Sequence, residues 1–207
     1  NLIIKAANIL RNCYPDKNLG VDIFLNKNIP IGAGLAGGSS NAAATLIGLN
    51  QLWLLNLDQT TLHKFALQLG SDVPFFLEGG SQYCFGRGEI LEKSRFDSKF
   101  FLIILKNPKV SLSTSKIYKK YSDKFQGSYL SSEIEYEGKR NNLRSIEFTY
   151  HNFLNRRIKI RNDLQKVVQN EDKSVSDALH LLSQIKECIS YSMSGSGPSC
   201  YGLFDNY

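Results

Sequence analysis

The sequence has few cysteines, no long apolar run and no dense cluster of charge. Its four cysteines, Cys13, Cys84, Cys188 and Cys200, are far apart and show no C-x-x-C spacing. The sequence therefore predicts neither a disulfide framework nor a metal site. No apolar run reaches the roughly 18 residues of a membrane span, and no leader-like segment opens the chain. We therefore expect a cytoplasmic protein without a membrane partner.

The charge balance also excludes a class of partner. The formal net charge is +6, but most of the excess comes from Lys and Arg residues scattered after Lys93. Nucleic-acid binding usually requires a concentrated basic face, often with interleaved aromatic residues, and the sequence shows no such run. We therefore expect no nucleic acid as partner.

The chain is long enough for two small domains, with 207 residues of which 42% are apolar. Helical and strand-like patterns alternate irregularly, which favours the α+β class and a boundary near Pro108, giving domains 1–107 and 108–207. Asn1 and Asp58 stand where they can cap helices, and Gly70 can end the second of these. The predicted helices cover 2–13, 41–53, 59–69, 142–155, 162–170 and 174–190, and a turn followed by a helix is predicted within 111–121. The predicted strands are an alternating segment at 20–30, two short ones within 81–93, a buried one within 99–108, and a strand, glycine turn and strand over 191–204.

One segment is unusually poor in side chains. The stretch IPIGAGLAGGSSN, residues 29–41, holds four glycines and two serines directly before a helical pattern. Glycines let backbone N–H groups converge, and a helix start adds the positive end of its dipole, so the segment is suited to bind phosphate. Ser39, Ser40 and Asn41 either cap the helix or donate to a phosphate or its magnesium ion, and the sequence leaves both alternatives open.

Two common phosphate motifs fit this segment poorly. No lysine follows the glycines, so the P-loop pattern G-x-x-x-x-G-K-[ST] is absent. Gly32, Gly34 and Gly37 satisfy G-x-G-x-x-G, and Asp58 lies at a suitable distance for a dinucleotide ribose contact. However, Asp58 sits at a helix start, where it is better explained as an N-cap.

Two further stretches carry candidate chemistry. In LGSDVPFFLEGG, Asp72 lies between a helix end and Pro74, where it is either a general base or a turn residue bonded to its own backbone. The stretch Gly195-Ser196-Gly197 is a third glycine turn, which either closes over the same ligand or only joins two strands.

Taken together in this order, these stretches resemble one superfamily. The motifs PIGAGLAGGSSNAAA, GSDVPFF with GRGE, NDL at 162–164 and MSGSGPSCYGLF are similar to those of the GHMP small-molecule kinases. The resemblance runs through nearly the whole chain. Ala36 stands where many members have another glycine, which still leaves room for phosphate.

The resemblance implies the GHMP kinase fold, with a ribosomal protein S5 domain 2-like N-terminal domain and a ferredoxin-like C-terminal domain. It further implies ATP and Mg²⁺ as cofactors, a small-molecule substrate, and a monomer or weak homodimer. The implied reaction is phosphorylation of the 2-hydroxyl of a cytidine-diphosphate-linked methylerythritol in the non-mevalonate isoprenoid pathway. In-line phosphoryl transfer needs positioning and charge neutralisation more than covalent chemistry, which fits a backbone cradle and one carboxylate.

The resemblance also assigns roles to single positions. Asp72 matches the family's catalytic aspartate, which accepts the proton of the attacking hydroxyl. Thr114 and Tyr118 match positions that face the cytidine moiety, and the turn at Gly195, Ser196 and Gly197 belongs to the substrate site. The expected ATP-binding residues are Pro30, Ile31, Gly32, Ala33, Gly34, Leu35, Ala36, Gly37, Gly38, Ser39 and Ser40 at the phosphates and Asn1, Leu2 and Lys27 near the adenine.

The sequence departs from the family pattern at its ends. Members begin with a strand bearing a P-A-K-I-N-L motif, whose lysine neutralises charge beside the aspartate, followed by a Y-H pair that recognises cytosine. Neither motif is present, Lys5 is no substitute because its pattern is helical, and a final segment is also absent. We therefore expect the sequence to be part of a longer kinase. The alternatives are a shortened, catalytically impaired nucleotide-binding chain and a GHMP kinase for another small alcohol.

Overall fold

The computed structural model describes residues 1–94, 99–127, 129–130, 132–145, 152 and 160–205. The chain forms two compact units. The first unit comprises Asn1–Ile29 and Ala36–Ser94, and the second comprises Pro30–Leu35 and Arg95–Tyr207. The glycine segment is thus divided between the units. The units change over between residues 94 and 95, whereas the predicted domain boundary near Pro108 stays a prediction.

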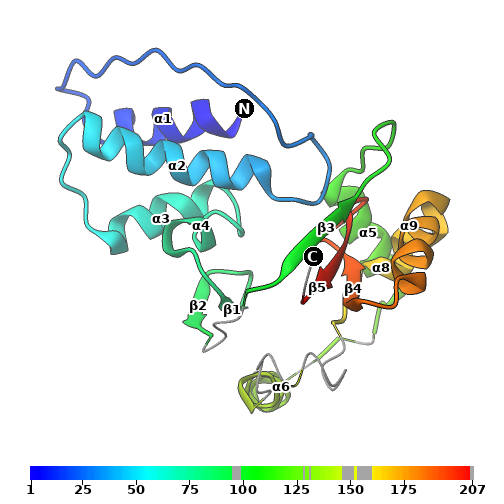
Figure 1. Ribbon diagram of the computed structural model, residues 1–207. Coiled ribbons are helices and arrows are strands. Elements are labelled where there is room, and N and C mark those ends of the chain that lie inside the picture. The colour runs from blue at the N-terminus through cyan, green and yellow to red at the C-terminus, as the bar shows by residue number, and fades with distance from the viewer. Residues whose placement is uncertain (95–98, 128, 131, 146–151, 153–159, 206–207) are drawn as a thin grey trace. The chain divides into compact units, whose positions relative to one another are not determined.

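The first unit is mostly helical. It contains α1 (Leu2–Asn12), α2 (Gly37–Leu52), α3 (Gln59–Leu69), the short α4 (Phe75–Glu78) and a hairpin of β1 (Gln82–Phe85) and β2 (Ile90–Lys93). α1 and α2 pack side by side, and α3 contacts both (Figure 1). These contacts build an apolar core in which Ala6, Leu10, Leu46 and Val73 are completely buried.

Two helix starts in the first unit follow the capping residues that the sequence predicts. The Asn1 side chain accepts a hydrogen bond from the N–H of Ile3 at 3.0 Å, and Asp58 accepts one from Thr61 at 2.8 Å. Each bond satisfies one of the N–H groups that a helix start leaves without an intrahelical partner. The prediction that Gly70 ends α3 is also confirmed.

The predicted strand at 20–30 is wrong, because the structure has no regular element there. Val21, Ile23 and Leu25, whose alternation suggested the strand, are 38%, 39% and 47% exposed. A strand needs a neighbour to take up its backbone hydrogen bonds, and the described residues form no ladder with this segment. The alternating pattern is therefore real, but it has no sheet to join within the described chain.

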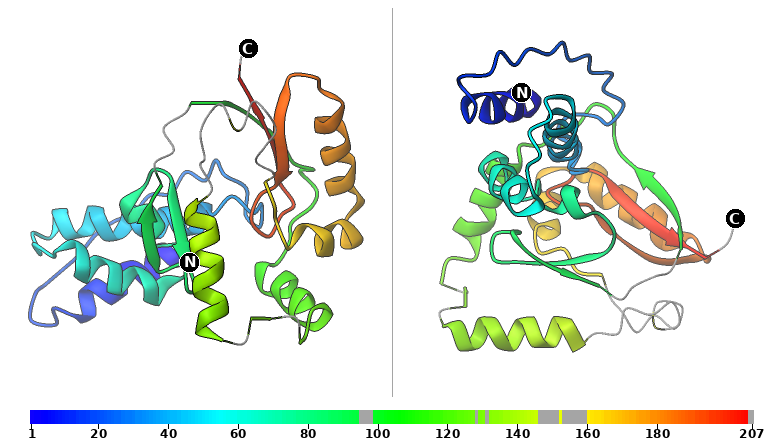
Figure 2. Two further views of the ribbon diagram at one scale, coloured as in Figure 1. Left: turned by 90° about the horizontal axis from the view of Figure 1, so that it is seen from below. Right: turned by 90° about the vertical axis from the view of Figure 1, so that its left-hand side faces the viewer.

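The second unit combines a sheet with helices. Its elements are β3 (Phe101–Leu105), α5 (Thr114–Lys124), α6 (Glu133–Ser145), α8 (Gln165–Glu171), α9 (Lys173–Gln184), β4 (Cys188–Met193) and β5 (Cys200–Phe204). The strands form an antiparallel sheet in the order β3-β5-β4. α9 runs alongside β4 (Figure 2), and its Leu182 is completely buried in the core with Val168 and Met193.

Several predicted boundaries need correction. α2 begins at Gly37 and not at residue 41, so two of the segment's glycines are helical. α9 ends at Gln184, because the chain enters β4 at Cys188. α6 begins at Glu133, inside a stretch that reads as polar loop, and residues 146–151 and 153–155 of the predicted helix 142–155 lie outside the described residues.

Strand β3 exists as predicted, but it is not buried. Its residues Phe101 to Ile104 are 43–53% exposed, because β3 is an edge of the described sheet and pairs with β5 alone.

Among the described helices, none is long and apolar enough to cross a membrane.

Candidate functional site

The amino end of α2 offers backbone N–H groups instead of side chains. Its N-cap, Ala36, has a left-handed backbone (φ 49°) and makes no side-chain capping bond. The Ser40 hydroxyl donates to the Gly37 carbonyl at 3.2 Å, so it is turned to the helix's own backbone. The first turn therefore leaves backbone N–H groups that side chains do not cap, and phosphate binding by the glycine segment stays a prediction.

Lys27 is positioned by the same helix start. A Cβ added to Gly37 would lie 3.0 Å from Lys27 Nζ and 2.9 Å from Ile29 Cγ2. When the Asn41 amide is turned over so that both of its ends find partners, its oxygen accepts a hydrogen bond from Lys27 Nζ at 3.2 Å and its nitrogen donates to the Gly37 carbonyl at 3.3 Å. The absent side chain at Gly37 thus lets an ammonium group reach the positive end of α2, where it adds to the attraction for an anion.

The other two residues predicted near the adenine belong to the start of α1. Leu2 approaches the same helix, since a Cβ on Gly38 would lie 3.5 Å from Leu2 Cδ1. Asn1 caps α1. The first unit therefore brings Leu2 and Lys27 to the glycines that open α2.

Asp72 lies in a tight turn between α3 and α4. It is exposed, whereas the next residue, Val73, is completely buried and its N–H donates to the Gly70 carbonyl at 3.1 Å. The tip of the β1–β2 hairpin packs on this turn, because a Cβ on Gly88 would lie 2.8 Å from the Ser71 carbonyl oxygen. Buried and fixed neighbours thus hold the Asp72 carboxylate at the surface, where it can meet a substrate.

The hairpin also brings a thiol toward Asp72. Burial raises the pKa of the Cys84 thiol, and the negative charge of Asp72 raises that pKa further. Cys84 stays protonated, so it does not compete with Asp72 as a base.

In the second unit, the first half of the glycine segment packs on the turn at 194–199. The Ser194 hydroxyl donates to the Gly34 carbonyl at 2.8 Å, and the Ser199 N–H donates to the Ala33 carbonyl at 3.2 Å. Gly34 has a left-handed backbone (φ +72°), and a Cβ there would lie 2.4 Å from the Ser194 carbonyl oxygen and 2.7 Å from that of Gly197. Glycine is required at position 34 because two backbone segments touch there.

The amino end of α5 meets the same turn. The hydroxyls of Thr114 and Ser196 are 2.8 Å apart and hydrogen-bonded, and Ser196 is 6% exposed. Just before α5, the Leu112 N–H donates to the Gly32 carbonyl at 3.2 Å. Three segments that are distant in sequence therefore converge within the second unit: residues 30–35, the start of α5 and the turn at 194–199.

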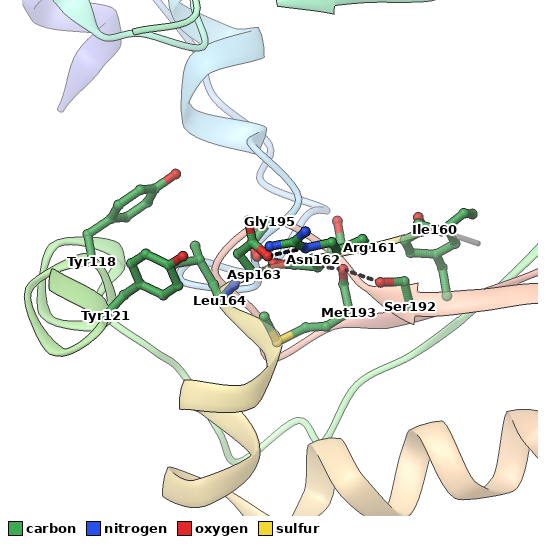
Figure 3. Close-up of a pocket in the computed structure, with 12 residues that line it drawn as sticks. Tyr118, Tyr121, Ile160, Arg161, Asn162, Asp163, Leu164, Ser192, Met193 and Gly195 are labelled. Atoms are coloured by element: carbon green, nitrogen blue, oxygen red, sulfur yellow. Dashed lines mark hydrogen bonds and ion pairs between the residues drawn. The ribbon is translucent and has the colours of Figure 1, made fainter. Parts of the chain in front are cut away.

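A pocket of about 570 Å³ opens next to this convergence (Figure 3). It lies between α5, the segment before α8, and the end of β4. Tyr118 and Tyr121 project from the same helix, and Tyr118 is 58% exposed. The lining residues are Tyr118, Tyr121, Ile160, Arg161, Asn162, Asp163, Leu164, Ser192, Met193, Ser194, Gly195 and Tyr201.

Sequence reasoning missed part of this pocket. Tyr121 follows Tyr118 by three residues, a spacing that places both side chains on one helix face. This spacing is a sequence signal that could have identified Tyr121 as a pocket residue. Burial and the neighbouring Asp163 carboxylate raise the pKa of Tyr121, so its hydroxyl stays protonated and can donate a hydrogen bond. Arg161 and Asp163 form an ion pair at the pocket, and no sequence signal beyond the NDL motif pointed to them.

The described residues contain no group of three or more His, Cys, Asp or Glu side chains that could hold a metal ion. A magnesium ion usually keeps several waters and is bound through one or two carboxylates and the phosphates of a nucleotide. The chain therefore offers no preformed magnesium cage in its described part.

Comparison with protein families matches both ends of the chain. The family described as "GHMP kinases N terminal domain" matches residues 1–80, and "GHMP kinases C terminal" matches residues 150–207. These two segments together make up about two thirds of the chain.

Alignments with curated relatives cover almost the whole chain. A 4-diphosphocytidyl-2-C-methyl-D-erythritol kinase of Prochlorococcus marinus subsp. pastoris (strain CCMP1986 / NIES-2087 / MED4) is 56% identical over 204 residues, covering 99% of this chain and 65% of the relative. The kinase of the same name from Prochlorococcus marinus (strain AS9601) is 57% identical with the same coverage. The chain thus spans 65% of the length of these relatives.

A solved structure has the same fold. The crystal structure of a 4-(cytidine 5′-diphospho)-2C-methyl-D-erythritol kinase matches with a TM-score of 0.69 and 28% identity, over 98% of this chain and 68% of that chain. The predicted α+β fold of this superfamily is therefore confirmed.

Proposed function

The chain belongs to the GHMP kinases, and from this premise we propose that it transfers the γ-phosphoryl group of ATP to the 2-hydroxyl of 4-diphosphocytidyl-2-C-methyl-D-erythritol. The observation that carries the proposal is the identity of 56–57% over 99% of the chain with kinases of that name. The products would be the 2-phosphate of the acceptor and ADP. This reaction would be one step in the non-mevalonate pathway to isoprenoid precursors.

ATP would bind along the glycine segment. Residues 30–40 would cradle the phosphates, because the start of α2 directs N–H groups outward and Gly34 admits close backbone approach. Lys27 would add a positive charge at the same helix start, and Asn1 and Leu2 would lie toward the adenine. The cradle would thus hold the triphosphate without a P-loop lysine.

Asp72 would act as the general base. Its carboxylate is exposed on a rigid turn, so it can accept the proton of the 2-hydroxyl while the hydroxyl oxygen attacks the γ-phosphorus and ADP leaves. The raised pKa of the Cys84 thiol keeps that neighbour neutral, so it would not take the proton in place of Asp72.

The acceptor would bind to the second unit. Tyr118 would stack on the cytosine, since an exposed aromatic face suits a flat base. Thr114 and the turn at Gly195, Ser196 and Gly197 would contact the remainder of the substrate, because the Thr114–Ser196 hydrogen bond places their hydroxyls together.

Magnesium would arrive with ATP, held mainly by phosphate oxygens and water. Its role would be to neutralise charge on the phosphates. We assign no protein ligand to it, because the described side chains gather no group of metal-binding type.

The test is to follow ADP release with three acceptors: 4-diphosphocytidyl-2-C-methyl-D-erythritol, mevalonate and homoserine. We expect kcat/KM for the first to exceed that for the others by at least 100-fold. A preference for mevalonate or homoserine would move the activity elsewhere within the family. ATP binding without ADP release for any acceptor would support a nucleotide-binding chain that lacks transfer.

A further inference from the structure

Asn162 opens the NDL motif, and the proposed function gives it no role. Its amide nevertheless makes three hydrogen bonds. We propose that Asn162 is a positioning residue, which fixes the turn at residues 194–199 so that the acceptor binds productively. The proposal rests on the proposed function for its kinetic consequence, but its structural part can be tested alone.

The geometry of Asn162 uses each part of its amide. Nδ2 donates to the carbonyl oxygens of Met193 and Gly195, both at 2.8 Å, and Oδ1 accepts from the Leu164 N–H at 3.0 Å. An amide NH₂ has two donors, and both are used on the chain that leaves β4. One side chain therefore ties the start of α8 to the start of the turn.

Gln165 holds the same residue, Met193, at its N–H. Its Oε1 accepts from the Met193 N–H at 3.0 Å and from the Ser192 hydroxyl at 3.3 Å. The main chain of Met193 is thus held at its N–H by Gln165 and at its carbonyl by Asn162. Ser192 and Met193 are almost fully buried, so their ends of these partly buried bonds lie away from water.

The turn that Asn162 holds touches both proposed ligand sites. On the acceptor side, Ser196 bonds to Thr114 at 2.8 Å. On the nucleotide side, the Ser194 hydroxyl bonds to the Gly34 carbonyl at 2.8 Å. Asn162 itself reaches neither Thr114 nor Gly34, so its effect on ligands is exerted through the turn.

A small displacement of this turn has few ways to relax. A Cβ added to Gly195 would lie 3.1 Å from the Gly34 carbonyl oxygen, and one added to Gly197 would lie 2.7 Å from Met193 Sδ. Because the turn is packed this closely, a shift at the Gly195 carbonyl is passed on to Ser196. Misplacement of about 1 Å at a positioning contact can cost on the order of 10²-fold in rate.

We expect the acceptor to be affected more than ATP. The turn presents Ser196 to the acceptor, and Asn162 is bonded to the residue directly before it. The nucleotide segment has further anchors, since Leu112 and Ser111 bond to Gly32 and Ile31 at 3.2 Å each. Loss of Asn162 should therefore leave the nucleotide segment largely in place.

The variant is Asn162→Asp, which keeps the oxygen that faces Leu164 and replaces both donors by an acceptor. Asn50→Asp is the matched control: the Asn50 amide also clamps backbone, donating to the Leu57 carbonyl at 3.2 Å and accepting its N–H at 3.0 Å. Asn50 belongs to the first unit and contacts no proposed site residue in these bonds. Asn162→Ser, which removes the donors without adding charge, replaces the first variant if that variant fails to fold.

The kinetic readout compares the change in kcat/KM for the acceptor with the change in KM for ATP. For Asn162→Asp we expect kcat/KM for the acceptor to fall at least tenfold while KM for ATP changes less than threefold. For Asn50→Asp both should stay within twofold, even where the melting temperature falls. The proposal is overturned if kcat/KM for the acceptor is unchanged in Asn162→Asp. It is also overturned if Asn50→Asp lowers this kcat/KM by the same factor when the two variants have lost the same stability.

The second readout is amide hydrogen exchange, which needs no turnover. The Ser194 N–H donates to the Ser199 carbonyl at 2.8 Å, and the Gly197 N–H donates to the Ser194 carbonyl at 2.9 Å. We expect both amides to exchange at least tenfold faster in Asn162→Asp and at the original rate in Asn50→Asp. If the unmodified protein transfers no phosphate but this result holds, the proposed function fails and the positioning of the turn stands. Unchanged exchange overturns the role of Asn162.

Discussion

The turn at Asp72 and the turn at Gly195 are held by different kinds of interaction. Around Asp72, main-chain bonds, the buried Val73 and the close approach of Gly88 to Ser71 set the conformation. The turn at Gly195 also has main-chain bonds, from Ser194 N–H and Gly197 N–H, but side chains add to them: Asn162 bonds to the Gly195 carbonyl, and the Ser194 hydroxyl bonds to the Gly34 carbonyl.

The difference predicts how each turn tolerates substitution. A turn set by its own backbone keeps its shape when an exposed side chain on it is replaced, so a variant at Asp72 should report on chemistry. A turn set by polar side chains loosens when one of them is removed, because a buried partner is left without its hydrogen bond. Replacing the Asp72 side chain therefore tests catalysis in the first unit, and replacing the Asn162 side chain tests positioning in the second.

The largest effect is expected at Asp72. Asp72→Asn keeps the size of the side chain but removes the base, so kcat for phosphoryl transfer should fall by about 10³-fold, in the middle of the usual range for a positioned base. The dissociation constant for ATP, measured by calorimetry, should stay within threefold, and hydrogen exchange at Val73 should be unchanged. An unchanged kcat would remove Asp72 from the mechanism.

The next largest effect is expected at Gly34. Gly34→Ala places a Cβ 2.4 Å from the Ser194 carbonyl oxygen at a left-handed residue, and should lower the free energy of unfolding by about 2–4 kcal/mol. It should also abolish measurable ATP binding, because the segment must move away from the turn. Chemical denaturation and calorimetry measure the two effects.

Gly48→Ala is the control for Gly34. Gly48 lies within α2, and a Cβ there meets no atom within 4 Å. This change should raise the free energy of unfolding by about 0.5–1 kcal/mol, since alanine favours the helix. If both glycine variants changed the free energy of unfolding alike, close packing would not explain why position 34 requires glycine.

Much of the fold followed from local signals in the sequence. Asn1, Asp58 and Gly70 marked helix ends correctly, because capping depends on a few adjacent residues. The strand at 20–30 failed, because its alternation shows which side chains would share a face but not whether a partner strand lies beside it. The burial expected of β3 failed for the same reason.

The candidate site was less predictable than the fold. Short motifs located the glycine segment, Asp72 and the Gly195 turn, since each depends on local backbone requirements. The clamp by Asn162 and the pairing of Thr114 with Ser196 join residues 31–82 positions apart, and no local pattern encodes such pairs. The roles of these site residues stay predictions until the variants are measured.

A smaller effect is expected at Tyr118, on the acceptor side. Stacking of a base on an aromatic ring contributes about 1–3 kcal/mol, so Tyr118→Ala should raise KM for the acceptor roughly tenfold. Tyr118→Phe keeps the ring and should stay within threefold, and the KM for ATP should change in neither variant. Equal loss in both variants would show that the hydroxyl, and not the ring, contacts the acceptor.

The smallest effect is expected at Asp58, which caps the start of α3, whereas the Asp72 turn follows the end of that helix. Its hydrogen bond to Thr61 lowers the pKa of the carboxyl below its usual value. A lowered folded-state pKa gives stability that is present above the unfolded pKa, about 3.9, and lost as pH falls through the folded value. Asp58→Ala should therefore lower the melting temperature by roughly 2–4 °C at pH 7. This difference should shrink progressively below about pH 4.

Asp123 provides the control, because it is exposed and lies in the last turn of α5, where a negative charge faces the negative end of the helix. Asp123→Ala should leave the melting temperature unchanged or slightly higher at pH 7. Thermal melts of both variants from pH 7 to pH 3 make the comparison. If the Asp58→Ala difference persisted at pH 3, the cap would not depend on the ionised carboxylate, and its lowered pKa would need another cause.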